Sequence, residues 1–318
     1  MGYVDGMSHD VAGEAPSWSE VVRVRAPAKV NLALCVGARA SDGYHPLRTI
    51  FQAVSLWDEV TATPAPGGVL DVVVEGRDAS LVPTDGTDLT VRAAALLRQR
   101  CGTPGLGAHL HVAKAIPVAA GLAGGSADAA AALLACSVLW DLDTDPEMLA
   151  ELGAELGSDV PFALLGGTAL GTGRGSDLLP LLTRGRYQWV LAFAHRTLST
   201  PAVYQRFDEL IGCGRAELPA GLLEALVRGD AAAAGLRLAN DLQGPAVDLY
   251  PELGQTLAFG TVLHGVLGSL VSGSGPTCAF LCADARSAAA VADRLAELPA
   301  VRATRLVAGA VPGAQLLS

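Results

Sequence analysis

Three glycines fall within five positions of one segment, at Gly121, Gly124 and Gly125, directly before a run of alanine and leucine. The run predicts a buried helix over about 127–139, so the glycines form a loop that ends at a helix N-terminus. There the first backbone N–H groups have no partners within the helix and lie at the positive end of its dipole, an arrangement that binds phosphate. We expect Ser126 to cap this helix, with a hydroxyl that can also contact phosphate or a bound Mg²⁺.

This loop matches neither of the two common nucleotide-binding patterns. No lysine follows its glycines, as one does in a Walker A loop, and their spacing is not G-x-G-x-x-G. The chain also lacks the alternating strand and helix pattern of a dinucleotide-binding domain, which disfavours a dinucleotide-dependent oxidoreductase. The loop therefore predicts a seat for a nucleoside triphosphate, and the alternative is a helix-packing turn in a protein rich in small residues.

The chain contains only two lysines, Lys29 and Lys114, because arginine supplies nearly all of its positive charge. Where arginine has replaced lysine so widely, a remaining lysine indicates a site that requires a compact ammonium group, unless both are chance remnants. Lys114 lies three residues before the first loop proline. Lys29 lies two residues before Asn31, so both side chains project from the same face of a predicted strand. A polar pair on an otherwise apolar strand requires a buried acid or a ligand as partner, unless the strand edge is exposed.

A lone acidic residue lies in a second glycine-containing segment, Gly157-Ser158-Asp159-Val160-Pro161. An aspartate in such a turn commonly caps a helix or forms an Asx-turn. Here the valine, proline and phenylalanine that follow Asp159 predict a partly buried carboxylate instead.

Composition limits the classes of function. The chain has 318 residues, of which 51% are hydrophobic, and a formal net charge of −10, which gives no global attraction for nucleic acid. No apolar run reaches the length of a membrane span, and residues 1–18 resemble a flexible extension rather than a signal peptide. Six cysteines without a C-x-x-C pair indicate reduced core residues of a cytoplasmic protein.

The hydrophobic patterns predict an α+β protein with an N-terminal domain over 19–182 and a C-terminal domain over 187–318. In the first domain we expect strands over 21–34 (interrupted at Pro27), 51–60, 70–74 and 109–112, and helices over 88–100 and 146–156. In the second we expect strands over 189–194, 277–281 and 303–308, and helices over 201–211, 219–228 and 286–298. Loops are expected over 41–46 and, as a second glycine turn, over 271–276.

Together these segments resemble the GHMP kinase superfamily, named after galactokinase, homoserine, mevalonate and phosphomevalonate kinases. The resemblance extends from about residue 23 to 315 and is closest to the branch that acts on 4-diphosphocytidyl-2-C-methyl-D-erythritol. It rests on five segments: residues 27–32, the Asp-Gly-Tyr-His sequence over 42–45, the loop over 117–127, residues 157–161 and residues 272–276. It implies a two-domain fold with the active site in the cleft between the domains.

The resemblance implies a small-molecule kinase of the non-mevalonate isoprenoid pathway, which moves the γ-phosphoryl group of ATP to the 2-hydroxyl of the methylerythritol moiety. Asp159 matches the family's catalytic aspartate, which accepts or orients the hydroxyl proton. Lys29 matches the lysine that keeps this carboxylate ionised and faces the developing charge.

For the substrate, the resemblance implies that cytosine lies between the rings of Tyr44 and Tyr204, with His45 at the base-recognition position. Thr200 and Asn31 match polar substrate contacts. Stacking tolerates any base, so selection of the base must come from hydrogen bonds to the pyrimidine edge. From the sequence alone, Tyr204 can instead be a core residue of a helix and His45 an ordinary loop residue.

For ATP and its Mg²⁺, the resemblance implies a nucleotide site with Asp88 and Leu89 at the adenine pocket, Lys114 nearby, and the whole phosphate loop: Pro117, Val118, Ala119, Ala120, Gly121, Leu122, Ala123, Gly124, Gly125, Ser126 and Ala127. Two positions depart from the family's pattern. Asp88 stands where asparagine is usual, and a carboxylate cannot donate to a ring nitrogen. Ala127 stands where a second serine is usual, so a hydroxyl is absent there.

Two alternatives remain open from the sequence. One is another kinase of this superfamily, of the homoserine or mevalonate type, and the other is an inactive member that only binds ligand. The intact pair of Lys29 and Asp159 argues against the second. We expect a monomer or weak homodimer, with no nucleic-acid or membrane partner.

Overall fold

The computed structural model describes residues 21–212 and 214–318, so the extension expected over 1–18 lies outside the described residues. The strands are β1 (Val22–Val36), β2 (Leu47–Ala65), β3 (Leu70–Gly76), β4 (Gly107–Lys114), β5 (Thr168–Thr172), β6 (Asp177–Pro180), β7 (Tyr187–Ala194), β8 (Ala239–Asn240), β9 (Val266–Val271), β10 (Cys278–Cys282), β11 (Val301–Gly309) and β12 (Gln315–Leu317). The helices are α1 (Leu89–Arg100), α2 (Gly124–Leu139), α3 (Pro146–Leu156), α4 (Val160–Leu165), α5 (Thr200–Leu210), α6 (Leu222–Arg228), α7 (Ala231–Gly235), α8 (Gln243–Leu249), α9 (Glu252–Thr261) and α10 (Ala285–Ala296).

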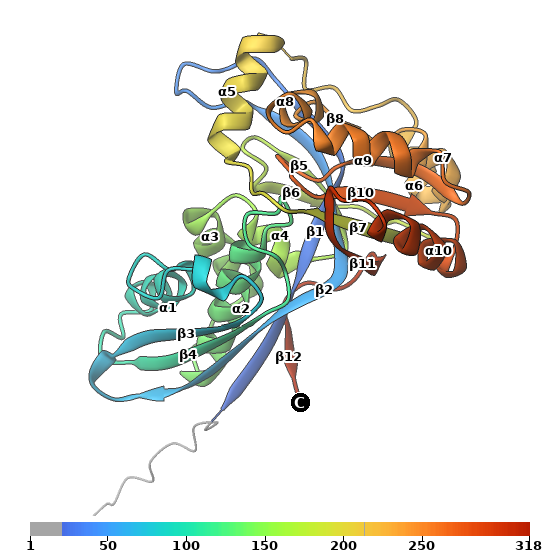
Figure 1. The fold of residues 1–318 in the computed structure, drawn as a ribbon. Coiled ribbons are helices and arrows are strands. Elements are labelled where there is room, and N and C mark those ends of the chain that lie inside the picture. The colour runs from blue at the N-terminus through green and yellow to red at the C-terminus, as the bar shows by residue number, and fades with distance from the viewer. Residues whose placement is uncertain (1–20, 213) are drawn as a thin grey trace, which may run out of the picture.

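One twelve-stranded sheet joins the two halves of the chain, with β12, β1, β2, β11, β7, β10 and β9 in that order. The long strands β1 and β2 pair antiparallel and run from one half into the other, as Figure 1 shows. The C-terminal strands return to the N-terminal half, since β11 pairs with β2 and β12 with β1. The expected division near 182–187 therefore separates two groups of helices, while the sheet and its core continue across it.

Helices α1, α2 and α3 pack with β1–β4 in the larger hydrophobic core, which also takes in Trp189 and Leu191 of β7. The alanines of α2 have almost no exposed surface. Small side chains let this helix approach β1 and β2 closely, which sets the phosphate loop directly over the strand that carries Lys29. The mixed α+β class expected from the sequence is confirmed.

A second core lies under α5, α8, α9 and α10. The ends of the two long strands belong to it, because Leu34 and Val36 of β1 and Leu47 of β2 pack there. The connecting loop over 37–46 consequently lies beside α5, although the two are far apart in the sequence. This arrangement brings the Asp-Gly-Tyr-His segment to the same place as Tyr204.

Two local expectations are wrong. Pro27 does not interrupt β1, because the strand absorbs it with a shift of register between Pro27 and Ala28. Ser126 does not cap α2, because the helix begins at Gly124 and its N-cap is Ala123, in a left-handed conformation with φ of 60°. Two glycines are poor helix formers and concealed this early start.

Strands β2, β3 and β4 extend beyond their expected bounds because ladder pairing continues past the apolar core. The expected helices over 88–100 and 146–156 are confirmed as α1 and α3. The five described cysteines are free thiols, and all but Cys101 are buried. No helix within the described ranges has the length and apolar character to cross a membrane.

Candidate active site

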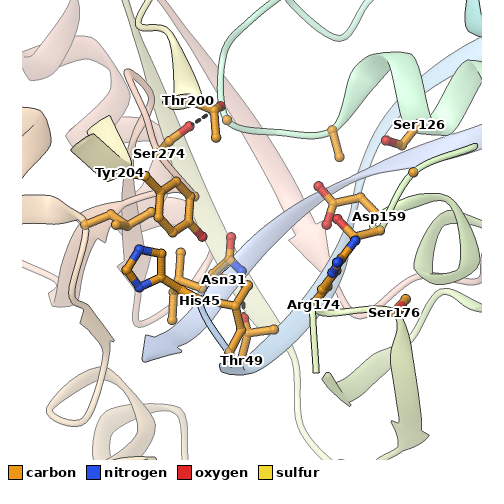
Figure 2. A pocket seen from close by; sticks show the side chains of 18 of the residues that line it. Asn31, His45, Thr49, Ser126, Asp159, Arg174, Ser176, Thr200, Tyr204 and Ser274 are labelled. Atoms are coloured by element: carbon orange, nitrogen blue, oxygen red, sulfur yellow. Dashed lines mark hydrogen bonds between the residues drawn. The ribbon is translucent and has the colours of Figure 1, made fainter. Parts of the chain in front are cut away.

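A cleft of about 1250 Å³ receives side chains from both halves of the chain. Figure 2 shows Ser126 and Asp159 on one side of this space and Tyr204 and His45 on the other, with Asn31 and Thr49 between them. The cleft is lined by parts of the phosphate loop, β1, the 37–46 loop, β2, the end of α3, the turn before α4, the turn between β5 and β6, α5 and the second glycine turn.

Two hydrogen bonds to its backbone carbonyl groups hold the phosphate loop in place. The N–H of Lys29 donates to the carbonyl of Leu122 at 3.1 Å, and the hydroxyl of Ser272 donates to the carbonyl of Gly121 at 3.1 Å. Gly121 has φ of 76°, and a Cβ there would lie 2.2 Å from the carbonyl oxygen of Ser272. Only glycine fits this contact, which locks the phosphate loop against the second glycine turn.

Seven of the eleven predicted loop residues line the cleft: Ala119, Ala120, Gly121, Ala123, Gly124, Gly125 and Ser126. The other four, Pro117, Val118, Leu122 and Ala127, do not line it. Leu122 and Ala127 are fully buried in the core. The departure from the family pattern at Ala127 therefore falls in packed apolar surroundings rather than at the phosphate seat.

Lys29 lies in the floor of the cleft and is almost completely buried. Its ammonium donates to the side-chain oxygen of Asn31 at 2.7 Å, Asn31 donates to the hydroxyl of Thr49 at 2.7 Å, and Thr49 donates to the carbonyl of Ala33 at 2.7 Å. This chain of bonds fixes which end of the amide faces Lys29. The pair expected on one strand face is thus confirmed, and it is buried rather than at an exposed edge.

Asp159 occupies the N-cap position of α4, but its side chain accepts no capping hydrogen bond. The carboxylate lines the cleft instead and is half-buried. The charge of Asp159 affects the pKa of two groups across the cleft. Burial lowers the pKa of Lys29, and the charge of Asp159 opposes that shift. Burial raises the pKa of Tyr204 to about 12, and Asp159 adds to it.

On the opposite side, α5 presents Thr200 and Tyr204 to the cleft. The Thr200 and Ser274 hydroxyls are hydrogen-bonded at 2.8 Å, as the dashed line in Figure 2 marks. Tyr204 is stacked on the ring of His45 with 5.5 Å between centroids. Tyr44 is 56% exposed, and the guanidinium carbon of Arg174 lies 3.7 Å from the centre of its ring.

His45 is buried, so it is not an ordinary loop residue. Its Nδ1 lies 2.9 Å from the carbonyl of Gly37, and its Nε2 lies 3.1 Å from a carboxylate oxygen of Asp208. Phe207 packs edge-on against the ring. These contacts fix the imidazole firmly beside Tyr204.

Lys114 does not line the cleft. Its ammonium is buried between the carboxylates of Asp58 and Asp128, at 2.5 Å from each. Burial lowers the pKa of Lys114, but the two carboxylates together raise it above its ordinary value. Asp58 also accepts from the backbone N–H groups of Ala115 and Ile116, so the cluster braces the segment that enters the phosphate loop. Direct contact with ATP, expected for Lys114, has no support in this placement.

Asp88 is likewise behind the cleft wall rather than in it. Its buried carboxylate caps α1 by accepting from the N–H groups of Thr90 at 2.8 Å and Val91 at 3.3 Å. The usual asparagine would cap equally well, because both side chains supply the required oxygen. Leu89 does line the cleft, and its side chain lies against Gly125.

Sequence reasoning missed several groups that border the cleft, including Arg39, Thr49, Phe51, Arg174, Asp208, Gly273 and Ser274. The second glycine turn was recognised as a motif but not placed in the site. Gly273 has φ of 57°, and a Cβ there would lie 3.0 Å from the carbonyl oxygen of Gly121 and 3.2 Å from the Lys29 ammonium, so this turn favours glycine. Arg174 and Asp208 lie in segments without a distinctive pattern, and only the fold brings them here.

Comparison with known proteins gives consistent results. Residues 88–167 match the N-terminal domain model of the GHMP kinases, and residues 222–300 match the C-terminal one. The 4-diphosphocytidyl-2-C-methyl-D-erythritol kinase of Cutibacterium acnes is 52% identical over 93% of this chain and 97% of its own length.

Among solved structures, a 4-(cytidine 5'-diphospho)-2C-methyl-D-erythritol kinase has a TM-score of 0.75 at 35% identity, over 91% of this chain and 99% of its own. A homoserine kinase from Cytophaga hutchinsonii also has a TM-score of 0.75, over 96% of this chain and 99% of its own, but at 18% identity. The second likeness shows the fold alone.

Proposed function

The chain belongs to the GHMP kinases, and on that premise we propose that it transfers the γ-phosphoryl group of ATP to the 2-hydroxyl of 4-diphosphocytidyl-2-C-methyl-D-erythritol. The products are the 2-phosphate and ADP, in isoprenoid precursor synthesis. The chain is a small-molecule kinase, as its relatives are. One observation carries the proposal: a single cleft holds a phosphate loop, the Lys29 and Asp159 side chains and an aromatic surface.

The reaction centre is the space between Asp159 and Lys29. Asp159 has no capping bond to hold its carboxylate, so it is available to accept or orient the proton of the attacking hydroxyl. Lys29 supplies a fixed positive charge where negative charge develops during phosphoryl transfer. Its ammonium is held by the oxygen of Asn31, so this charge is positioned before the substrates arrive.

The nucleotide half rests on the start of α2. The first N–H groups of this helix, at Gly124, Gly125 and Ser126, have no partner within the helix and would bind the phosphates, and Leu89 would offer an apolar contact at the adenine end. Among the described residues no cluster of three metal-ligating side chains is found. Mg²⁺ commonly takes only one or two protein oxygens beside phosphate and water, and the Ser126 hydroxyl fits that requirement. Bound there, the ion would neutralise phosphate charge.

The acceptor half rests on α5 and the 37–46 loop. The hydroxyls of Thr200 and Ser274 offer polar contacts, and Tyr44 and Tyr204 offer rings for the pyrimidine. With Arg174 now over the ring of Tyr44, the base must displace or share that contact to stack there.

The test is a substrate panel. Purified protein is incubated with ATP, Mg²⁺ and, in separate reactions, 4-diphosphocytidyl-2-C-methyl-D-erythritol, homoserine and mevalonate, and ADP release is followed. We expect turnover with the first substrate and at most traces with the others. Turnover of homoserine or mevalonate alone would reassign the acceptor within the family. Binding of ATP and of the cytidine ester without any ADP release would support the inactive alternative.

The monomeric or weakly dimeric state and the cytoplasmic location expected from the sequence stay predictions. Sedimentation of the purified protein over a range of concentrations tests the first of these.

A further inference from the structure

A ring of contacts joins β1, the phosphate loop and the second glycine turn beside the Lys29 ammonium. The backbone N–H of Lys29 donates to the carbonyl of Leu122, which ties β1 to the loop. The hydroxyl of Ser272 donates to the carbonyl of Gly121, which ties the loop to the turn. Gly273 follows in the turn, and a Cβ on it would lie 3.2 Å from the Lys29 ammonium. The ring closes only if the turn is also tied to β1.

Asn240 supplies this last link. Its Nδ2 group donates to the carbonyls of Val271 and Gly273, at 2.7 Å each, and its Oδ1 accepts from the N–H of Leu242 at 2.9 Å. Two acceptors beside one atom and a donor beside the other leave a single orientation for the amide. Both hydrogens of the Nδ2 group are used, so this side chain holds the turn on either side of Ser272.

Asn240 is itself fixed to the strand that carries Lys29. It is the last residue of β8, which pairs in parallel with β1 and places Asn240 opposite Leu34. The next residue continues the pairing, because the N–H of Asp241 donates to the carbonyl of Leu34 at 2.9 Å. The ring therefore runs from β1 through Asn240 and the second glycine turn to the phosphate loop, and back to β1.

We propose that Asn240 is a positioning residue for phosphoryl transfer, which acts through the second glycine turn on the phosphate loop and on Lys29. Asn240 does not itself line the cleft, so it acts only through the groups that it holds. Its amide sets the separation between the loop and the ammonium. Transfer depends strongly on such separations, since a misplacement of about 1 Å can lower a rate about a hundredfold. The inference deepens the proposed function, and its kinetic assay rests on the acceptor proposed there.

The experiment exchanges two adjacent side chains of nearly the same shape. Asn240→Asp removes both donors and sets a carboxylate oxygen against the two carbonyl oxygens of the turn. Asp241→Asn is the matched control, because it makes the reverse change at the next residue, where an amide oxygen can still accept from the N–H of Val36. Asn240→Ala removes the donors without adding a charge, so it keeps the test available if the repulsion prevents the first variant from folding.

For each protein, kcat per ATP-binding site, both KM values and the melting temperature are measured with ATP and the cytidine ester. We expect kcat to fall about ten- to a hundredfold in the Asn240 variants, with both KM values changed by no more than about twofold. In Asp241→Asn, kcat should match the unmodified protein. A lower melting temperature with unchanged kcat in the Asn240 variants would mean a structural role alone and would overturn the inference.

A second measurement does not depend on the acceptor. In ¹⁵N-lysine spectra of the Asn240 variants, the side-chain resonance of Lys29 should shift, because Gly273 lies beside its ammonium, while that of Lys114 should stay in place. An unchanged Lys29 resonance contradicts the inference. If the unmodified protein does not turn over the cytidine ester, the proposed function fails, and these spectra still decide whether Asn240 positions Lys29.

Discussion

The two lysines of this chain are buried to the same extent, each 6% exposed, yet their surroundings differ in kind. Lys114 lies between two carboxylates at 2.5 Å and belongs to a closed cluster beneath the phosphate loop. Lys29 is held by a neutral amide, and the nearest opposing charge, Asp159, is across open space. Burial alone therefore does not distinguish a structural cation from a reactive one. The neighbouring carboxylates distinguish the two, because an ammonium group that is already paired with carboxylates has no attraction left for a substrate.

The largest expected effect tests the open carboxylate. Asp159→Asn should lower kcat by about 10²- to 10⁴-fold, because proton transfer to a positioned base contributes that much. The melting temperature and the Kd for ATP should change little, since Asp159 makes no capping bond. Steady-state ADP release, thermal melting and ATP titration provide the three measurements. Asp143→Asn, at an exposed position, is the control, and a large fall in melting temperature in Asp159→Asn would make that residue structural instead.

Next, the closed cluster is tested by removing its cation. Lys114→Met leaves two buried carboxylates facing each other and should lower the free energy of unfolding by about 3–5 kcal/mol. Lys29→Met should change that free energy by no more than about 1 kcal/mol, because a desolvated ammonium is removed along with its single hydrogen bond, while activity is lost. Chemical denaturation of both variants gives the comparison. Equal losses of stability would remove the distinction between the two lysines.

A smaller effect is expected from breaking the chain of neutral hydrogen-bonding groups, Asn31 and Thr49, that holds the Lys29 ammonium. Thr49→Val removes the acceptor for the Asn31 amide and should lower kcat about tenfold, the cost of one unsatisfied buried group. Thr63→Val makes the same change at a half-buried position near the other end of the same strand and should leave kcat unaltered. If both variants keep full activity, the bonds from Thr49 do not position the ammonium.

The smallest effect concerns protonation and can be observed directly, because a chain with two lysines gives two side-chain nitrogen resonances. In ¹⁵N-lysine spectra, the pKa of Lys29 should lie below the ordinary lysine value of 10.5, and the pKa of Lys114 should lie above it. Asp159→Asn should lower the pKa of Lys29 further and leave that of Lys114 in place. If Lys114 instead had the lower pKa of the two, the assignment of Lys114 to the closed cluster and of Lys29 to the cleft would be reversed.

These shifts have opposite consequences for stability. The pKa of Lys114 is higher in the folded than in the unfolded chain, so its contribution is complete below the ordinary value of 10.5 and is lost as pH rises through the folded value. The pKa of Lys29 is lower in the folded chain, so its unfavourable contribution disappears as pH rises toward 10.5.

The phosphate loop, the shared face of Lys29 and Asn31 and the helices α1 and α3 could be predicted because each depends on neighbours in the sequence. Glycine spacing, strand alternation and capping residues are local signals. Even there, the start of α2 was placed too late, since Ala123 adopts a left-handed conformation that alanine rarely takes.

Contacts between distant segments could not be predicted in this way. The partners of Lys114 include Asp58, which no local pattern connects to it. The same holds for Asp208 and His45, and for Arg174 over Tyr44. In each case the side chains meet because β1 and β2 carry the chain from one core to the other. The role of each of these side chains depends on which other side chain it faces in the fold, and the pattern of a single sequence does not contain that information.

The long pairing of β1 with β2, which continues past two shifts of register, also limits how such an enzyme can diversify. A hinge between the halves would have to break ladder hydrogen bonds, so the distance between phosphate seat and acceptor pocket behaves as a constant of the architecture. Variation is left to the segments attached to the ladder, such as the 37–46 loop and α5. The same sheet can thereby be kept while the segments around the acceptor pocket change, and the fold shared with a homoserine kinase at only 18% identity is consistent with that.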